Sequence, residues 1–170
     1  MKIAFRILVA AMLVAGVTAC KKKTVKAPVD TTPVSQAETT PVDTSGRYTP
    51  DSLDSDSCLR QRVIYFDLDR TEIKSEFQAQ IACHAEYLRQ FPGARVTLEG
   101  HADERGTREY NLGLGERRGN AVRDALNGAG GSAGQLDVVS YGEERPVDRG
   151  HDESAWSKNR RVEVVYTSAQ

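Results

Sequence analysis

Residues 95–118 read RVTLEGHADERGTREYNLGLGERR, and this stretch gives the clearest indication of the fold. Its first part, 95–99, alternates polar and apolar side chains, which indicates a strand with one buried face. A polar loop at 101–107 follows. The segment 109–127 then carries apolar side chains at helical spacing, namely Leu112, Ala121, Val122, Ala125 and Leu126. The stretch therefore predicts a strand that leads through a short polar loop into a long helix.

The flanking segments extend this unit into a domain over residues 58–170. Runs of β-branched and aromatic side chains predict further strands at 63–66, 136–140 and 162–166. The segment 73–91 has helical spacing and ends at Pro92-Gly93, which predicts a helix, and a short helical turn is expected near 154–157. The order β-α-β-α-β-β predicts an α+β two-layer sandwich, with the helices on one face of a mixed four-stranded sheet.

The composition excludes several classes of protein. The chain has 170 residues, with 23 Lys and Arg against 24 Asp and Glu, and so lacks the net basic charge of a nucleic-acid binder. A mean hydropathy of -0.51 excludes a multi-span membrane protein. Three cysteines are too few for a disulfide-built scaffold, and 6% aromatic residues argue against a large aromatic-lined cofactor cavity. We therefore expect one small domain with an attached segment and no cofactor.

Residues 1–19 have the features of a cleaved signal peptide. Lys2 and Arg6 precede an apolar run at 7–17, which is too short to cross a bilayer as a helix. The sequence Val-Thr-Ala-Cys that ends at Cys20 resembles the lipobox of bacterial lipoproteins, whose cysteine carries the lipid and begins the mature chain. An ordinary secretory signal is the alternative. Lys21 stands where an aspartate would resemble the inner-membrane retention signal, which favours the outer membrane.

The lipidated Cys20 and residues 21–57 are expected to form a disordered tether. This segment holds four of the six prolines, is rich in Thr, Ser and Asp, and has no periodic apolar face. Such a composition buries too little apolar surface to offset the entropy of the chain. As a flexible coil the segment would have an r.m.s. span of about 30–35 Å, so the domain could act at a distance from the membrane.

The run Asp67-Leu68-Asp69-Arg70-Thr71 follows the first predicted strand. It matches the DxDxT signature of haloacid-dehalogenase-type phosphatases, in which one aspartate attacks phosphorus and the other transfers a proton. The alternative is a polar turn in which the aspartates accept hydrogen bonds from the backbone. Only about 100 residues follow, and no later strand ends in a paired acidic motif. We therefore expect a protein that is not an enzyme.

The loop at 101–107 and the helix after it suggest a pocket for an amino-acid head group. Exposed N–H groups and the dipole at a helix N-terminus attract carboxylates, and Asp103 adds an acceptor for an ammonium group. Asn111, Leu114 and Arg118 share one helix face, and the arginine can lean back toward the loop. Arginine and aspartate on two sides of a pocket suit a ligand that carries both carboxylate and ammonium.

Two other interpretations of these charges stay open. Arg118 could belong to a surface salt-bridge network with Glu116 or Asp124. A metal site would use His101, Asp103 and Glu104 of the loop. The other histidines have no matching spacing to these residues, so we expect no metal.

The segment 100–118 resembles the peptidoglycan-binding signature of the OmpA C-terminal domain family and, within it, the lipoprotein branch of the Tol-Pal system. Also similar are YFDLD at 65–69, VSYGEERP at 139–146, GHDESAWSKNRRVEVVY at 150–166 and the lipobox. The resemblance implies a periplasmic domain that binds peptidoglycan non-covalently through meso-diaminopimelate of the stem peptide. It also implies a second partner, TolB, which competes with peptidoglycan, and a role in envelope integrity and cell division.

The same resemblance assigns roles to residues. The two key positions fall on Asp103 and Arg118. The remaining contacts with the ligand would come from the loop backbone and nearby side chains: Phe66, Asp67, Ala102, Glu104, Arg105, Gly106, Thr107, Asn111 and Leu114. Gly119 departs from the family, which usually has alanine there, and a glycine inside a helix costs about 1 kcal/mol.

Cys58 and Cys83 are atypical for the family. Cys58 precedes the first predicted strand and Cys83 lies in the first predicted helix, two elements that we expect to pack together. In an oxidising periplasm the two thiols can form a disulfide. It would close a loop of about 25 residues and stabilise the fold by about 3 kcal/mol. Two isolated thiols are the alternative, and we favour the disulfide.

From the sequence we thus expect an outer-membrane lipoprotein that tethers the membrane to the cell wall. A periplasmic protein-interaction module and a DxDxT phosphatase are the alternative functions.

Overall fold

A computed structural model describes residues 47–170. The predicted signal peptide, Cys20 and most of the predicted tether therefore lie outside the described residues. The helices and strands are α1 Ser52–Ser55, β1 Val63–Tyr65, α2 Gln78–Gln90, β2 Arg95–His101, α3 Arg108–Gly128, β3 Leu136–Gly142, α4 Glu153–Asn159 and β4 Arg161–Ser168. In this part of the chain no helix is both long and apolar enough to cross a membrane.

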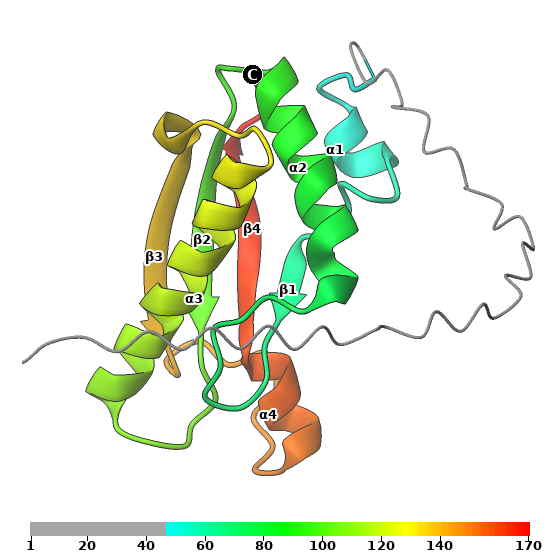
Figure 1. Cartoon of the computed structure of the whole chain (residues 1–170). Coiled ribbons are helices and arrows are strands. Elements are labelled where there is room, and N and C mark those ends of the chain that lie inside the picture. Colours follow the sequence, from blue (N-terminus) through cyan, green and yellow to red (C-terminus); the bar gives the residue numbers. More distant parts are fainter. Residues whose placement is uncertain (1–46) are drawn as a thin grey trace, which may run out of the picture. The chain divides into compact units, whose positions relative to one another are not determined.

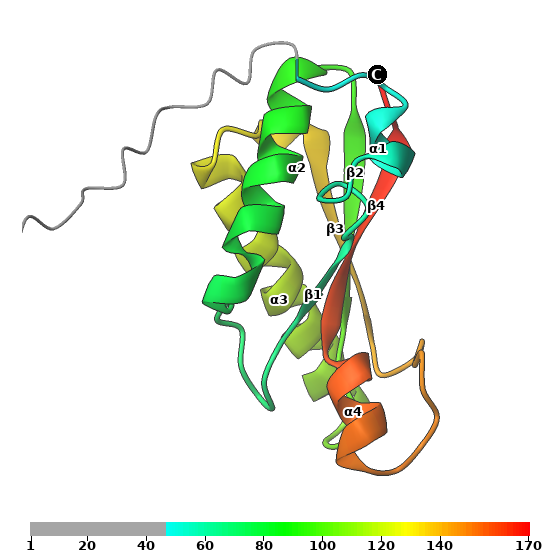
Figure 2. The same cartoon turned by 90° about the vertical axis from the view of Figure 1, so that its right-hand side faces the viewer.

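The four strands form one mixed sheet in the order β1-β4-β2-β3. Strand β4 pairs antiparallel with β1 and with β2, whereas β2 and β3 are parallel. A parallel pair needs a crossover connection, and α3 supplies it. Helices α2 and α3 lie side by side on one face of the sheet, and α4 lies beyond one end of it (Figures 1 and 2). The predicted α+β sandwich is confirmed.

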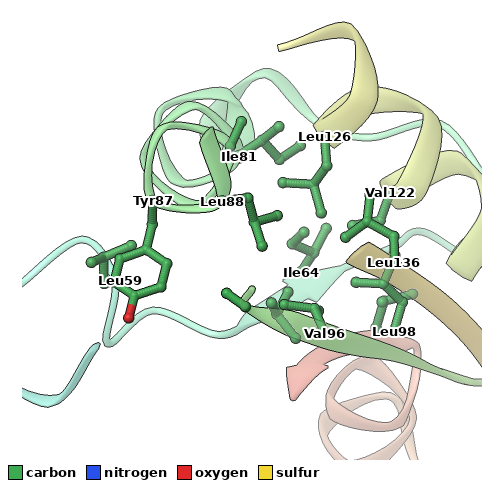
Figure 3. Packing of buried hydrophobic residues seen from close by; sticks show 14 of the residues in the cluster. Leu59, Ile64, Ile81, Tyr87, Leu88, Val96, Leu98, Val122, Leu126 and Leu136 are labelled. Atoms are coloured by element: carbon green, nitrogen blue, oxygen red, sulfur yellow. The ribbon is translucent and has the colours of Figure 1, made fainter. Parts of the chain in front are cut away.

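The hydrophobic core lies between the two long helices and the sheet (Figure 3). Because strand residues alternate between faces, β2 turns Val96 and Leu98 toward the helices. The facing side chains of α2 and α3 are Ile81, Leu88, Val122 and Leu126. Each fully buried Val, Leu or Ile side chain stabilises the fold by about 1.5–3 kcal/mol. This core holds the ends of β2 and α3 together, and the polar loop joins them there.

Helix α2 begins later than the sequence predicted, at Gln78 instead of residue 73. A single 3-10 turn at Ser75–Phe77 precedes it. The segment before that turn is an irregular loop, in which Lys74 Nζ lies 2.8 Å from Asp67 Oδ1. Arg118 on α3 also binds two backbone carbonyls of this loop. Contacts with distant residues therefore override the helical tendency of residues 73–77.

The folded domain begins earlier than the predicted boundary at residue 58. Tyr48 and Leu53 are only 5% and 6% exposed, and residues Ser52–Ser55 form helix α1. The Tyr48 backbone N–H donates to Gln90 Oε1 at 3.0 Å, and its ring lies 6.1 Å from that of Tyr87. The prediction of disorder up to residue 57 is thus wrong for residues 48–57, because Tyr48 packs against α2 and Leu53 joins the buried core.

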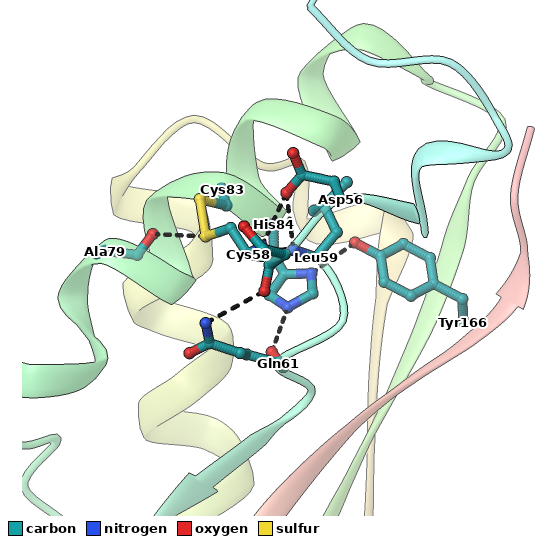
Figure 4. The surroundings of a disulfide bond; sticks show 9 residues. Asp56, Cys58, Leu59, Gln61, Ala79, Cys83, His84 and Tyr166 are labelled. Carbon is teal, nitrogen blue, oxygen red and sulfur yellow. Dashed lines mark hydrogen bonds between the residues drawn. A yellow bond between two sulfur atoms is a disulfide. The ribbon is translucent and has the colours of Figure 1, made fainter. Parts of the chain in front are cut away.

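A disulfide joins Cys58 to Cys83 of α2, with an S–S distance of 2.04 Å and a Cα–Cα distance of 6.3 Å (Figure 4). Next to it, the ring of His84 lies within hydrogen-bond distance of the Gln61 carbonyl at 2.9 Å and of the Tyr166 hydroxyl at 3.0 Å. The segment that enters the domain is therefore held to α2 by a covalent bond and by a buried histidine.

Helix α3 packs closely on the sheet through glycines. A Cβ atom at Gly100 would lie 2.0 Å from the Gly115 carbonyl oxygen, and one at Gly119 would lie 2.5 Å from Val138 Cγ1. Gly119 therefore has a packing role that the helix-propensity cost alone did not reveal. This close approach brings the first turns of α3 against the carboxyl end of β2.

Candidate functional site

A pocket of about 350 Å³ lies where β2 gives way to α3. The residues that line it are Leu68, Asp69, Asp103, Arg105, Gly106, Tyr110, Leu114 and Arg118. They come from three places: the loop after β1, the loop after β2 and the first half of α3. The structure thus brings together five of the residues named from the sequence, and it adds Leu68, Asp69 and Tyr110.

Arg118 forms the floor of this pocket and is fully buried. Its guanidinium donates to three backbone carbonyls: from Nε to Arg70 at 2.9 Å, from Nη1 to His101 at 2.8 Å and from Nη2 to Asp67 at 3.0 Å. It also lies 5.3 Å from the ring centroid of Phe66. Burial lowers the pKa of Arg118 to about 10, so it stays charged at neutral pH. Arg118 is therefore a buried positive charge that connects two loops, which excludes the surface salt-bridge network considered for it.

Asp103 lies in the pocket wall with a side chain that is 4% exposed. Its Oδ1 accepts hydrogen bonds from the backbone N–H and the Nε of Arg105, both at 3.1 Å. Its Oδ2 accepts from Arg105 Nη2 at 2.7 Å and from Arg160 Nη1 at 3.2 Å. Burial alone would raise the pKa of Asp103, but the hydrogen bonds from Arg105 and Arg160 outweigh it and lower that pKa. The Asp103 carboxylate is therefore ionised, and each of its two oxygens accepts two hydrogen bonds.

Asn111 and Thr107 shape the loop after β2 and do not line the pocket. The buried Asn111 amide donates to the backbone carbonyls of Asp103 at 3.1 Å and Arg105 at 3.2 Å. Thr107 caps α3 by accepting a hydrogen bond from the backbone N–H of Tyr110. Directly before Thr107, Gly106 has a φ of 116°, a conformation that glycine adopts without strain. Through the hydrogen bonds of Asn111 and the cap at Thr107, these residues fix the backbone of the loop that carries Asp103.

The outer wall of the pocket depends on Asp69 and Tyr110, which the sequence analysis missed as site residues. Asp69 has a φ of 55°, in the left-handed region that aspartate tolerates better than most residues. The Tyr110 hydroxyl donates to the Asp69 carboxylate across the pocket. Leu68, 52% exposed, stands beside them as an apolar side chain in a polar turn. The local sequence signal for this wall is the leucine inside the polar run 67–71, which the phosphatase comparison had singled out for another reason.

Phe66 and Asp67 do not line the pocket. Phe66 is 1% exposed and lies beneath Arg118. The Asp67 side chain faces solvent, where its hydrogen bond with Lys74 lowers its pKa. Asp67 contributes its backbone carbonyl to Arg118, whereas Asp69 binds Tyr110, so the two aspartates of the DxDxT run have different partners.

Ala102 and Glu104 face a second pocket, of about 360 Å³, on the other side of the same loop. Glu104 accepts from Trp156 Nε1 at 2.8 Å and lies 2.7 Å from His151 Nδ1. His101 is buried, and neither of its ring nitrogens has a hydrogen-bond partner in residues 47–170. Burial lowers its pKa to about 4. Within this range of residues, no three His, Cys, Asp or Glu side chains form a group that could hold a metal ion.

The first pocket therefore combines groups of three kinds. Asp103 and Asp69 offer negative charge, Arg105 and Arg118 offer positive charge, and Leu68 and Leu114 are apolar. A small ligand with ammonium and carboxylate groups on an aliphatic chain matches this combination. The Arg118 donors already bind backbone carbonyls and Arg105 is paired with Asp103, so a ligand carboxylate would meet the loop N–H groups more directly.

Comparison with known proteins shows the family of the chain. Residues 65–160 match the model of the OmpA family. The peptidoglycan-associated lipoprotein of Haemophilus influenzae is 50% identical over 107 residues, which cover 63% of this chain and 70% of that protein. The protein of the same name from Pseudomonas aeruginosa is 51% identical over 114 residues, 66% of this chain and 67% of its own length.

Solved structures show the same relationship. The crystal structure of the peptidoglycan-associated lipoprotein from Burkholderia pseudomallei matches with a TM-score of 0.67 and 44% identity, covering 69% of this chain and 99% of that one. The C-terminal domain of Helicobacter pylori MotB, at 21% identity and a TM-score of 0.57, shares the fold. It covers 62% of this chain and 84% of its own. The chain thus belongs to the OmpA family, alongside the proteins named peptidoglycan-associated lipoprotein.

Proposed function

We propose that this protein is an outer-membrane lipoprotein whose domain binds peptidoglycan non-covalently in the pocket between β2 and α3. The ligand group is meso-diaminopimelate of the stem peptide. The domain occupies the periplasm, and Cys20 carries the lipid that holds it to the outer membrane. The protein thereby tethers the membrane to the wall and performs no chemistry.

The observation that carries this proposal is the buried, ionised Asp103 beside Arg105 and Arg118 in a pocket with apolar walls. Diaminopimelate has an amino-acid head group at each end of an aliphatic chain, so its charges and its methylene groups match these walls. The names of the relatives, which associate those proteins with peptidoglycan, support the same ligand.

The proposal extends to the Tol-Pal system. TolB is the expected protein partner, its binding competes with peptidoglycan, and the complex serves envelope integrity and cell division. This part rests on the family resemblance alone. It would be tested by adding purified TolB to the protein bound to sacculi and measuring its release.

The test of wall binding is co-sedimentation of the purified protein with peptidoglycan sacculi. Asp103→Asn keeps the shape of the side chain and removes its charge, so we expect the bound fraction to fall at least tenfold. Free meso-diaminopimelate should release the wild type from the pellet. Asp103 is a better target than Arg118, because losing the Arg118 hydrogen bonds would also disturb the fold.

Asp137→Asn is the matched control, because Asp137 is an exposed aspartate on β3. This variant should pellet like the wild type. A wild-type protein that stays in the supernatant while its circular dichroism shows a folded domain would overturn the proposal. The alternative function, a periplasmic protein-interaction module, would then be favoured.

A further inference from the structure

The Asp103 carboxylate has no free position for a ligand. Arg105 binds both of its oxygens and Arg160 binds one of them. An ammonium group that binds Asp103 must therefore replace one of these two guanidinium groups. The contacts of the two arginines indicate which one is exchangeable.

Arg160 is fixed in place. Its side chain is 6% exposed, its Nε donates to the Phe66 carbonyl at 3.1 Å, and its Nη2 donates to Glu153. If the Arg160 side chain moved away, a nearly buried guanidinium would lose the Asp103 carboxylate and the Phe66 carbonyl would lose its side-chain donor, which is costly. Arg160 therefore stays on Asp103 whether or not a ligand is bound.

Arg105 has other partners close by. Its side chain is 33% exposed, and Nη2 lies 3.5 Å from Glu153 Oε2. Its guanidinium carbon lies 4.1 Å from the centroid of the Trp156 ring. Glu153 and Trp156 belong to α4 and do not line the pocket. A carboxylate and an aromatic face are both favourable for a guanidinium group, so Arg105 can leave Asp103 without losing all of its interactions.

We propose that Arg105 binds Asp103 in the ligand-free pocket, gives way there to the ligand ammonium group, and moves toward Glu153 along the Trp156 ring, which it already faces. Arg105 is then a specificity-determining residue, because a cationic group balances the buried carboxylate that Arg105 leaves, whereas a neutral donor does not. Glu153 and Trp156 are positioning residues that act through Arg105. The inference rests on the proposed function for the identity of the ligand, meso-diaminopimelate.

The single tryptophan of the chain gives a direct readout. Titration of the purified protein with meso-diaminopimelate should change the emission of Trp156, because the guanidinium beside its ring changes position. Calorimetry on the same samples measures binding independently. In Arg105→Gln we expect heat of binding without the change in emission. Arg123→Gln, which removes an arginine of α3 outside this pocket, should keep both signals.

A double-mutant cycle tests the role of Glu153. Glu153→Gln removes an alternative partner of Arg105, so it should weaken diaminopimelate binding about two- to fivefold, the usual range for a partly exposed ion pair. Arg105→Gln removes the competitor and should strengthen binding by a similar factor. In the Arg105→Gln background the Glu153→Gln change should have no further effect.

Each result has a distinct meaning. Heat of binding in the wild type with constant Trp156 emission overturns the displacement of Arg105 and leaves the proposed function intact. A Glu153→Gln loss that persists in the Arg105→Gln background also overturns it, because the loss would then act through Arg160. No heat in the wild type, together with no sedimentation on sacculi, overturns the proposed function and this inference with it.

Discussion

At the scale of single residues, Arg118 shows how a buried charge can organise a site. Its guanidinium joins the loop after β1 to the end of β2 through three carbonyl groups. The Asp67 carbonyl also accepts from the Arg70 backbone N–H, but all three carbonyls would lose a charged donor without Arg118. The pocket floor and the stability of the fold therefore depend on the same side chain.

We expect Arg118→Lys to lower the free energy of unfolding by about 1.5–3 kcal/mol, since a lysine keeps the charge but cannot reproduce a planar fork of donors. Urea denaturation measures this difference. Arg123→Lys on the same helix should change stability by less than about 0.5 kcal/mol. Equal stability of wild type and Arg118→Lys would show that the three hydrogen bonds contribute little.

His101 gives the fold a pH dependence. Its buried ring packs against Tyr141 and faces Arg145, Arg161 and Glu163. Its pKa is lowered to about 4, by burial first and then by Arg161. The unfolded chain takes up this proton near pH 6.5 and the folded chain only near pH 4. The stabilising contribution is therefore complete above pH 6.5 and is lost as the pH falls toward 4.

The corresponding variant is His101→Leu, which cannot bind the proton. We expect its free energy of unfolding to fall less between pH 6.5 and 4 than that of the wild type. Chemical denaturation at several pH values measures the two curves. His84, whose pKa burial also lowers, titrates in both proteins, so only the difference between the curves reports on His101. If the unfolding free energies of the wild type and of His101→Leu changed equally with pH, His101 would not be the source of this pH dependence.

At the scale of elements, the disulfide connects the entry segment to α2. The bond closes a loop with a sequence separation of 25 residues. We expect the double variant Cys58→Ser, Cys83→Ser to lose about 3 kcal/mol of unfolding free energy, from the larger entropy of its unfolded chain. Thermal unfolding with and without a reductant measures this loss. The reductant should destabilise the wild type and leave the double variant unchanged.

The contact of α3 with the sheet explains why the site lies where it does. Small residues at Gly100 and Gly115 let the helix approach β2 closely. The first turns of α3 therefore stand against the loop that carries Asp103. The same closeness places Arg118, farther along the helix, within reach of the carbonyls of both loops.

At the scale of the whole molecule, the proposed tether needs two attachments that are independent of each other. The lipid would sit on Cys20, far along the chain from the pocket residues. We expect Cys20→Ala to remove the protein from the outer-membrane fraction, while the purified protein still sediments with sacculi. Fractionation and co-sedimentation measure the two properties separately. Recovery of this variant in the outer-membrane fraction at the level of the wild type would disprove the lipid anchor.

The sequence alone determined the fold class and most of the elements, because side-chain periodicity records which face of a strand or helix is buried. Residues 95–127 illustrate this: alternation predicted β2, helical spacing predicted α3, and the family resemblance singled out Asp103 and Arg118. The same method assigned Tyr48 and Leu53 to a disordered tether, since two isolated apolar residues carry no periodic signal.

The tertiary structure alone decided the partners of the site residues. Arg118 binds Asp67 across 51 positions, Arg160 binds Asp103 across 57, and Tyr110 binds Asp69 across 41. Such pairs depend on how the loops approach one another after the core has formed. Periodicity describes only the neighbours of a residue along its own element. The sequence therefore predicts a pocket near Asp103. Only the packing of α3, α4 and the two loops shows that Arg105 and Arg160 already bind the Asp103 carboxylate.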